Sequence, residues 1–105
     1  MIDRNRLQSF GETSDVLDLE PLNEKLESFG FATRETDGHD VNGLSHILSG
    51  LPFAKDRPSA VICHTVKGKG FALAENDPKW HHSSRLSEEH LSALKASLLP
   101  VEQSA

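Results

Sequence analysis

A run of apolar and β-branched residues from Ala60 to Val66, followed at once by the basic loop from Lys67 to Gly70 (KGKG), constrains the fold of this chain more than any other feature. An unbroken apolar run predicts a strand that is buried on both faces. Anion sites in α/β folds occur where such a strand leads into a glycine-rich loop, because glycines let backbone amides approach a phosphate and lysines add positive charge. We therefore expect the rest of the chain to support this strand and its loop.

Helical and strand patterns alternate around that run. The sequence first predicts the end of a strand at Met1-Ile2, a loop over 8–18, and a helix from its Asp18 cap to Gly30 with Pro21 in the first turn. A strand over 31–36 and a helix from its Asp40 cap to Gly50 follow. After a loop over 52–58 come the central strand and a last helix from its Ser87 cap to Pro100. This order predicts an α/β fold, namely a partial doubly wound, mostly parallel sheet with covering helices. Ligands bind such sheets at the carboxyl ends of the strands, where Asp3 to Leu7 and Lys67 to Gly70 would lie.

The predicted helices carry apolar stripes that should cover the sheet. The stripe residues are Leu22, Leu26 and Phe29; Val41, Leu44, Ile47 and Leu48; and Leu91, Leu94 and Leu98. An apolar fraction of 36%, with no tyrosine, is low for a domain that folds alone, so some apolar faces should need another chain. Met1-Ile2 would leave a broken strand in the sheet, from which we expect association or poor solubility.

Charge and cysteine usage exclude several classes of function. A formal net charge of -5 argues against a general nucleic-acid or anionic-membrane binder, whose surface would be basic. The single cysteine, Cys63, excludes an internal disulfide, and its place in the apolar strand favours a buried hydrophobe over a nucleophile. No signal peptide or membrane-length apolar segment is present, so the cytoplasm is the expected location.

Two polar segments could join the basic loop in a site, although each also has a structural interpretation. The basic loop from Lys67 to Gly70 is either an anion site or a solvated turn. The histidines of Trp80-His81-His82 are either surface residues or include an imidazole that closes over the same anion. Adjacent histidines in an extended segment point in opposite directions, so His81 and His82 should not share a metal. The Asn5 side chain and a backbone carbonyl two residues on suit Mg²⁺ or Ca²⁺, but without another carboxylate a turn with salt-bridged arginines is favoured.

Five motifs, taken together in order and spacing, resemble the thiamine-diphosphate-binding region of transketolases. They are Asp3-Arg4-Asn5-Arg6-Leu7-Gln8, Phe29-Gly30-Phe31, Asp37-Gly38-His39-Asp40, Thr65-Val66-Lys67-Gly68-Lys69-Gly70 and Glu75-Asn76-Asp77-Pro78-Lys79-Trp80-His81. The resemblance runs from Asp3 to about Leu99. It implies that residues 1–105 are the C-terminal half of a transketolase-type thiamine-diphosphate-binding domain.

This resemblance implies roles for particular residues, with thiamine diphosphate and Mg²⁺ as cofactors. Asn5 matches the asparagine of the family's cofactor motif, and Leu7 matches the residue whose backbone carbonyl binds the metal. Lys67 matches a lysine that faces the cofactor phosphates. His81 matches the catalytic histidine near the diphosphate and the reacting substrate.

Departures from the family pattern shape the functional hypotheses. The Gly-Asp-Gly half of the cofactor motif is absent, as is the domain that supplies the glutamate acting on the aminopyrimidine ring. His82 replaces a usual glycine, and Arg4 stands where many members have a second asparagine.

The leading hypothesis is a part of a transketolase that moves a two-carbon ketol unit between sugar phosphates. It would be inactive without complementary transketolase chains or a homo-oligomer. The alternative is a non-catalytic α/β assembly or regulatory module of the same fold, and a third hypothesis is a simple anion-binding protein.

Overall fold

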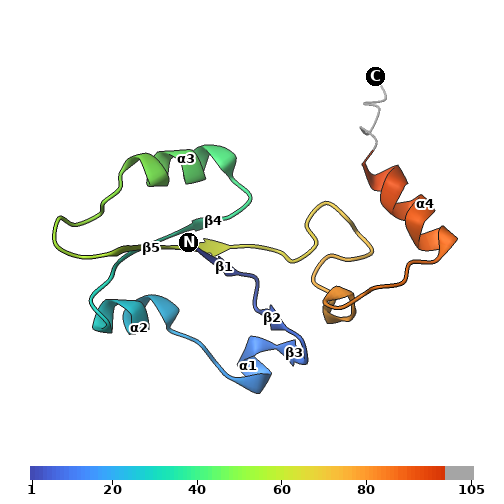
Figure 1. Cartoon of the computed structure of the whole chain (residues 1–105), viewed down its shortest axis with the longest axis horizontal. Coiled ribbons are helices and arrows are strands. Elements are labelled where there is room, and N and C mark those ends of the chain that lie inside the picture. The colour runs from blue at the N-terminus through green and yellow to red at the C-terminus, as the bar shows by residue number, and fades with distance from the viewer. Residues whose placement is uncertain (99–105) are drawn as a thin grey trace.

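A three-stranded parallel sheet with helices beside it forms the centre of the molecule in the computed structural model, which describes residues 1–98. In chain order the elements are β1 (Ile2–Arg4), β2 (Leu7–Gln8), β3 (Gly11–Glu12), α1 (Thr13–Val16), α2 (Leu22–Ser28), β4 (Ala32–Asp37), α3 (Val41–Ser49), β5 (Ser59–His64), the 3-10 helix η1 (Pro78–Trp80) and α4 (Glu88–Ser97). The sheet order is β1-β5-β4, all parallel, while β2 and β3 form a separate antiparallel ribbon (Figure 1). The predicted α/β class and parallel sheet are confirmed.

The core lies along β5, the central strand of that sheet. Its residues from Ala60 to Cys63 are all buried, and Ile62 is only 1% exposed. Ile62 pairs with Ile2 on one side and with Glu35 on the other, while α2 and α3 lie on opposite faces of the sheet (Figure 1). The prediction of a strand buried on both faces is therefore confirmed, although β5 ends at His64 rather than at Val66.

Local hydrogen bonds explain why several helix ends could be predicted correctly from the sequence. The Asp40 carboxylate accepts from the backbone amides of Asn42 and Gly43 at 3.1 and 3.0 Å, so this residue caps α3 as predicted. Gly30, with a φ of +95°, ends α2, and Phe31 N donates to the Leu26 carbonyl at 3.1 Å. Ser87 caps α4 by accepting from His90 N at 3.1 Å.

The start of α2 corrects the sequence prediction. Asp18 does not cap this helix, which begins at Leu22 after Pro21 and has no side-chain cap. The Asp18 carboxylate instead accepts from Glu20 N at 3.0 Å and so stabilises the preceding turn.

The expectation of a loop over 8–18 is also wrong. This segment contains β3 and the short helix α1. Thr13 N donates to the Arg6 carbonyl at 2.9 Å, and this hydrogen bond holds the segment against the end of β1.

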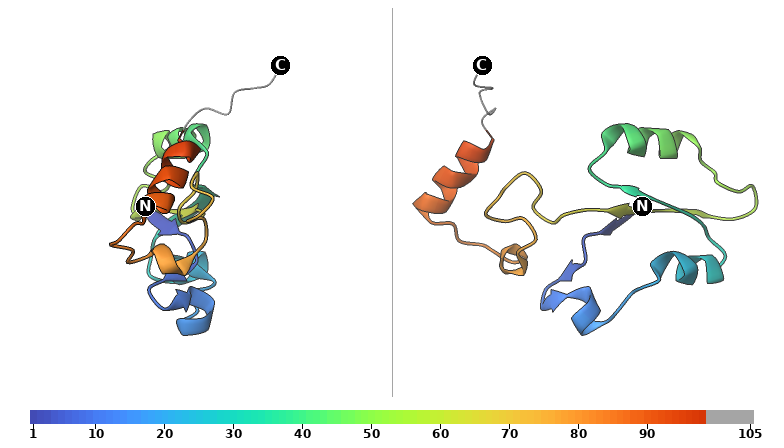
Figure 2. Two further views of the ribbon diagram at one scale, coloured as in Figure 1. Left: turned by 90° about the vertical axis from the view of Figure 1, so that its right-hand side faces the viewer. Right: turned by 180° about the vertical axis from the view of Figure 1, so that it is seen from behind.

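The helices shield the sheet only in part, which corrects the predicted apolar stripes. Phe29 is 82% exposed, Val41 is 76% exposed and Leu98 is 70% exposed. The three-stranded sheet is too narrow to bury all three helices, and α4 lies away from it (Figure 2). Pro100, the predicted end of the last helix, lies outside the described residues. None of the helices in residues 1–98 has the length and apolar character needed to span a bilayer.

Candidate functional site

The glycine-rich loop after β5 is a closed turn with a defined shape. Gly68 and Gly70 have φ values of +76° and +96°, which L side chains rarely adopt. A Cβ at Gly68 would also lie 2.6 Å from the Ala74 carbonyl oxygen, so the chain passes too closely there for a side chain. Asn76 N donates to the Lys67 carbonyl at 2.8 Å and closes the loop. The loop therefore has a defined backbone conformation and is not only a flexible basic segment.

A pocket of about 400 Å³ opens beside this loop, at the carboxyl ends of β1 and β5. Its lining residues are Asp3, Asn5, His39, Thr65, Val66, Lys67, Gly68, Lys69 and Phe71. The parallel pairing of Arg4 with His64 places the segment after β1 next to the loop after β5. The fold thus brings Asn5 and Lys67 to one pocket, at the strand ends where ligands of α/β sheets bind.

Asn5 begins a tight turn that leads to Leu7. Its Oδ1 accepts from Leu7 N at 2.9 Å, and Arg6 between them has a left-handed φ of +65°. An amide oxygen has two lone pairs, so this bond leaves Asn5 Oδ1 able to accept a second partner. Asn5 and Leu7 also line a neighbouring pocket of about 270 Å³.

The oxygen donors of this turn fit a hard cation, but they are too few to hold one. Mg²⁺ prefers carboxylate, amide and carbonyl oxygens. Within residues 1–98 there is no group of three or more His, Cys, Asp or Glu side chains that could hold a metal ion. A metal at Asn5 would need further ligands from another segment or from a bound phosphate.

Arg4 supports the Asn5 turn from the opposite face of β1. Its side chain is buried, and its Nε donates to Glu20 Oε1 at 2.7 Å in an ion pair. Arg4 Nη1 donates to the Thr13 hydroxyl at 3.2 Å, and that hydroxyl donates to the Arg6 carbonyl. The expected salt-bridged arginine is thus Arg4, and it connects the turn to the chain before α2.

Glu20 is held in its charged form by this contact. The hydrogen bond from Arg4 comes first among the causes that lower the Glu20 pKa, followed by the bond that Leu22 N donates to the same carboxylate. The Glu20 side chain remains 48% exposed.

His39 and Asp3 belong to the site, although the sequence did not assign them a role. His39 Nε2 accepts from Val66 N at 2.8 Å, and Asp3 Oδ1 accepts from the Thr65 hydroxyl at 2.5 Å. These bonds hold the first residues of the loop after β5. No spacing rule could have found them, because each joins residues that are far apart in the sequence.

His81 lies near Lys67 but does not line the pocket that holds Lys67 and Asn5. Its Nδ1 is buried, with no hydrogen-bond partner among the described residues. Desolvation of the ring, followed by the charges of Lys67 and His82, lowers the His81 pKa.

The two adjacent imidazoles do not point apart, which corrects the sequence expectation. The rings of His81 and His82 lie edge to face with centroids 4.7 Å apart. His81 has helical dihedral angles at the end of η1, so the assumption of an extended segment fails there. His82 also contacts the Ser9 hydroxyl at 3.2 Å.

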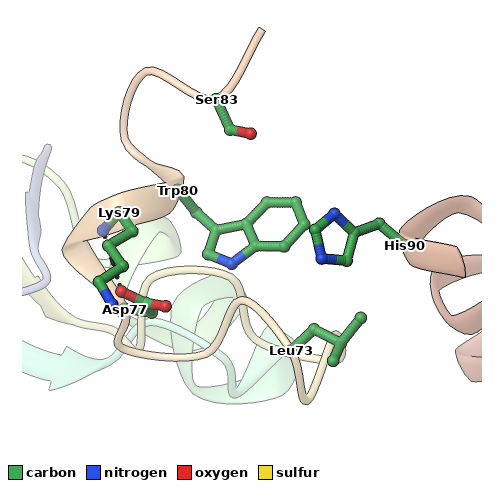
Figure 3. A pocket seen from close by; sticks show the side chains of 6 residues that line it. All are labelled: Leu73, Asp77, Lys79, Trp80, Ser83 and His90. Carbon is green, nitrogen blue, oxygen red and sulfur yellow. Dashed lines mark hydrogen bonds between the residues drawn. The ribbon is translucent and has the colours of Figure 1, made fainter. Parts of the chain in front are cut away.

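A separate pocket of about 360 Å³ lies between η1 and α4, lined by Leu73, Asp77, Lys79, Trp80, Ser83 and His90 (Figure 3). The Trp80 and His90 rings meet edge to face with centroids 5.6 Å apart. None of the predicted site residues lines this pocket. The contact between the Trp80 and His90 rings joins η1 to α4.

Comparison with known proteins identifies the family. The family described as "Transketolase, thiamine diphosphate binding domain" matches residues 1–101. The chain is 33% identical over 95 residues to one of the subunits of the apulose-4-phosphate transketolase of Phocaeicola vulgatus, covering 90% of this chain and 34% of the relative. It is 32% identical over 96 residues to a 6-deoxy-6-sulfo-D-fructose transketolase subunit of Clostridium sp., covering 91% and 34%. The chain belongs to the transketolase family, in its thiamine-diphosphate-binding domain, and spans about a third of the length of these curated relatives.

Proposed function

We propose that this chain forms part of the cofactor site of a thiamine-diphosphate-dependent transketolase, which transfers a two-carbon ketol unit between sugar phosphates. One observation carries the proposal. Asn5 and Lys67, the residues matched to the metal and the cofactor phosphates, line one pocket at the ends of neighbouring parallel strands. The closed loop from Lys67 to Gly70 and the family match over residues 1–101 support it.

Each site residue has a distinct task in this proposal. Asn5 Oδ1 and the Leu7 carbonyl are two oxygen ligands of Mg²⁺, and the Lys67 ammonium neutralises diphosphate charge. His81, whose Nδ1 has no hydrogen-bond partner within residues 1–98, is the group that hydrogen-bonds the substrate or moves a proton near it. When bound, thiamine diphosphate supplies the carbanion chemistry, and the residues of this chain bind and orient it.

We further propose that catalysis requires a partner chain. Within residues 1–98 there is no group of three or more His, Cys, Asp or Glu side chains that could hold the metal, and the family resemblance places the glutamate for the aminopyrimidine ring in another domain. Electrostatic contributions of this kind are each worth about 3 kcal/mol in transition-state stabilisation. Both relatives described above are named as transketolase subunits, which supports an assembly of separate chains.

Calorimetric titration of thiamine diphosphate with Mg²⁺, into the chain alone and into a mixture with a candidate partner that carries a Gly-Asp-Gly segment, tests the proposal. We expect binding and ketol transfer only in the mixture. Ketol transfer by the chain alone would contradict the partner requirement. No binding under either condition would replace the proposal with the non-catalytic module of the same fold.

A further inference from the structure

Arg6 lies between the two proposed metal ligands and has an uncommon backbone conformation. Its φ is +65°, in the left-handed region that residues other than glycine enter at a cost. The Asn5 side chain closes the turn around it by accepting from Leu7 N at 2.9 Å. The directions of Asn5 Oδ1 and of the Leu7 carbonyl therefore depend on how firmly Arg6 is held in this conformation.

Contacts on two sides hold Arg6. Its carbonyl accepts from Thr13 N at 2.9 Å, which fixes the backbone. Its side chain is exposed, but its Nη2 lies 3.4 Å from Nδ1 of His64, the last residue of β5. Arg6 forms no ion pair within residues 1–98, so no carboxylate there competes with His64 for the guanidinium.

The chemistry of these groups determines the tautomer of His64. Arginine can only donate, so His64 Nδ1 must accept from Arg6. Nε2 of the same ring lies 2.6 Å from Glu35 Oε2, and an ionised carboxylate only accepts, so Nε2 carries the proton. A doubly protonated ring would instead present an N–H group to a guanidinium that also only donates. Glu35, on β4, thus selects the neutral tautomer in which Nδ1 can accept from Arg6.

We infer that His64 is a positioning residue for the turn from Asn5 to Leu7. Glu35 holds the His64 ring in one tautomer, in which Nδ1 orients the Arg6 side chain. The Arg6 backbone then presents Asn5 Oδ1 and the Leu7 carbonyl to the cation. The role of this turn rests on the proposed function. Neither His64 nor Glu35 lines the pocket beside the glycine-rich loop, so both act through Arg6.

A long-range proton–nitrogen NMR correlation spectrum of the isotope-labelled chain at neutral pH tests the tautomer. This measurement distinguishes a protonated ring nitrogen from an unprotonated one. We expect His64 to carry its single proton on Nε2. A proton on Nδ1, in the other tautomer or in the charged ring, would overturn the inference.

Two variants of His64 separate its two contacts. The side-chain amide of His64→Asn lies near the position of Nδ1, so its oxygen can still accept from Arg6, whereas the amide of His64→Gln reaches the position of Nε2. Hydrogen exchange at Leu7 N reports on the turn, because this amide donates to Asn5 Oδ1. We expect His64→Gln to accelerate this exchange about threefold or more, the contribution of one hydrogen bond, and His64→Asn to retain the native rate. Equal rates in the two variants would overturn the inference.

Two controls accompany the exchange measurement. The amide of Ile62, in the buried part of β5, reports on global unfolding and should exchange at the same rate in both variants. In an Arg6→Ala background, His64→Gln should have no further effect on Leu7, because the residue through which it acts is gone. A further acceleration there would show that His64 acts by another route and would overturn the inference.

Calorimetric titration of thiamine diphosphate with Mg²⁺, into the chain mixed with the partner that carries a Gly-Asp-Gly segment, connects the turn to the cofactor. We expect His64→Gln to weaken binding about threefold or more and His64→Asn to retain it. Native affinity in His64→Gln would overturn the inference. No binding by the unmodified mixture would instead contradict the proposed function, and the tautomer and the Leu7 exchange rates would still decide whether His64 orients the turn.

Discussion

Lys67 is the residue on which the cofactor proposal can be tested most simply. Replacing it with Gln keeps the length of the side chain close to the original but removes a charge that faces the proposed diphosphate. We expect the affinity for thiamine diphosphate, measured by calorimetry in the presence of the partner, to fall about 10-fold or more. Lys55→Gln, at an exposed lysine in the loop before β5, is the matched control and should leave the affinity unchanged.

The environment of His81 predicts a pH dependence of stability. Because desolvation and then Lys67 lower the His81 pKa in the folded chain, the unfolded chain takes up the proton more readily. No effect is expected above the ordinary histidine pKa of about 6.5. Stability should fall as the pH decreases below that value, until His81 is also protonated in the folded chain.

NMR titration of the His81 ring checks this prediction. We expect a midpoint below about 6.5 in the native chain and a higher midpoint in Lys67→Gln, where one of the two charges is removed. A native midpoint at or above the ordinary value would show that the buried Nδ1 has a partner in solution.

At the scale of elements, two glycine substitutions in the loop after β5 distinguish the effect of backbone strain on stability from the effect of steric crowding. Gly68 and Gly70 both have positive φ, but only at Gly68 would a Cβ meet another part of the chain, while nothing lies within 4 Å at Gly70. Gly70→Ala should therefore destabilise the chain by about 1 kcal/mol, through strain alone. Gly68→Ala should cost about 1–3 kcal/mol more, measured by denaturant unfolding. Equal losses would mean that the loop moves freely away from Ala74.

The Arg4–Glu20 contact couples β1 to the segment before α2. Glu20→Gln leaves the buried guanidinium without a charged partner, and we expect a loss of about 1 kcal/mol, since the half-exposed carboxylate is screened by solvent. The Glu20 pKa is lowered on folding, so this contribution is present above the ordinary pKa of about 4.3 and is lost as the pH falls through the folded value. Unfolding measured at neutral and at acid pH should show the loss only at neutral pH. Glu24→Gln, a change at an exposed position of the neighbouring helix α2, is the control.

Helix ends that depend on contacts between residues close in the sequence could be predicted, and those that depend on a choice between competing partners could not. The Asp40 cap and the Gly30 ending depend on contacts within a few residues, and both were predicted from the sequence. The start of α2 is different, because Asp18 had a competing backbone partner in Glu20 N. Sequence patterns show that a residue can cap a helix but do not show which of several nearby amides it binds.

At the scale of the whole molecule, the chain is more extended than a compact domain of this length, and several large apolar side chains of the described residues are exposed. Its radius of gyration is 17.5 Å, whereas about 13 Å is typical for a compact domain of similar length. Both outer edges of the β1-β5-β4 sheet are unpaired within residues 1–98. We therefore expect light scattering to give a mass above the 11.5 kDa of a single chain. A clean monomer at high concentration would contradict this expectation, and addition of a true partner should replace self-association with a defined complex.

The sequence by itself determined the buried strand, the presence of a glycine-rich loop after it and the caps of α3 and α4, because these depend on hydrophobic runs, on glycine and on contacts between near neighbours. It also indicated Asn5, Lys67 and His81 as candidates, through resemblance to a family. Only the tertiary structure decided that Asn5 and Lys67 line one pocket at the strand ends. The reason is physical, since the register of the parallel pairing between β1 and β5 sets those distances, and that register depends on contacts between distant segments.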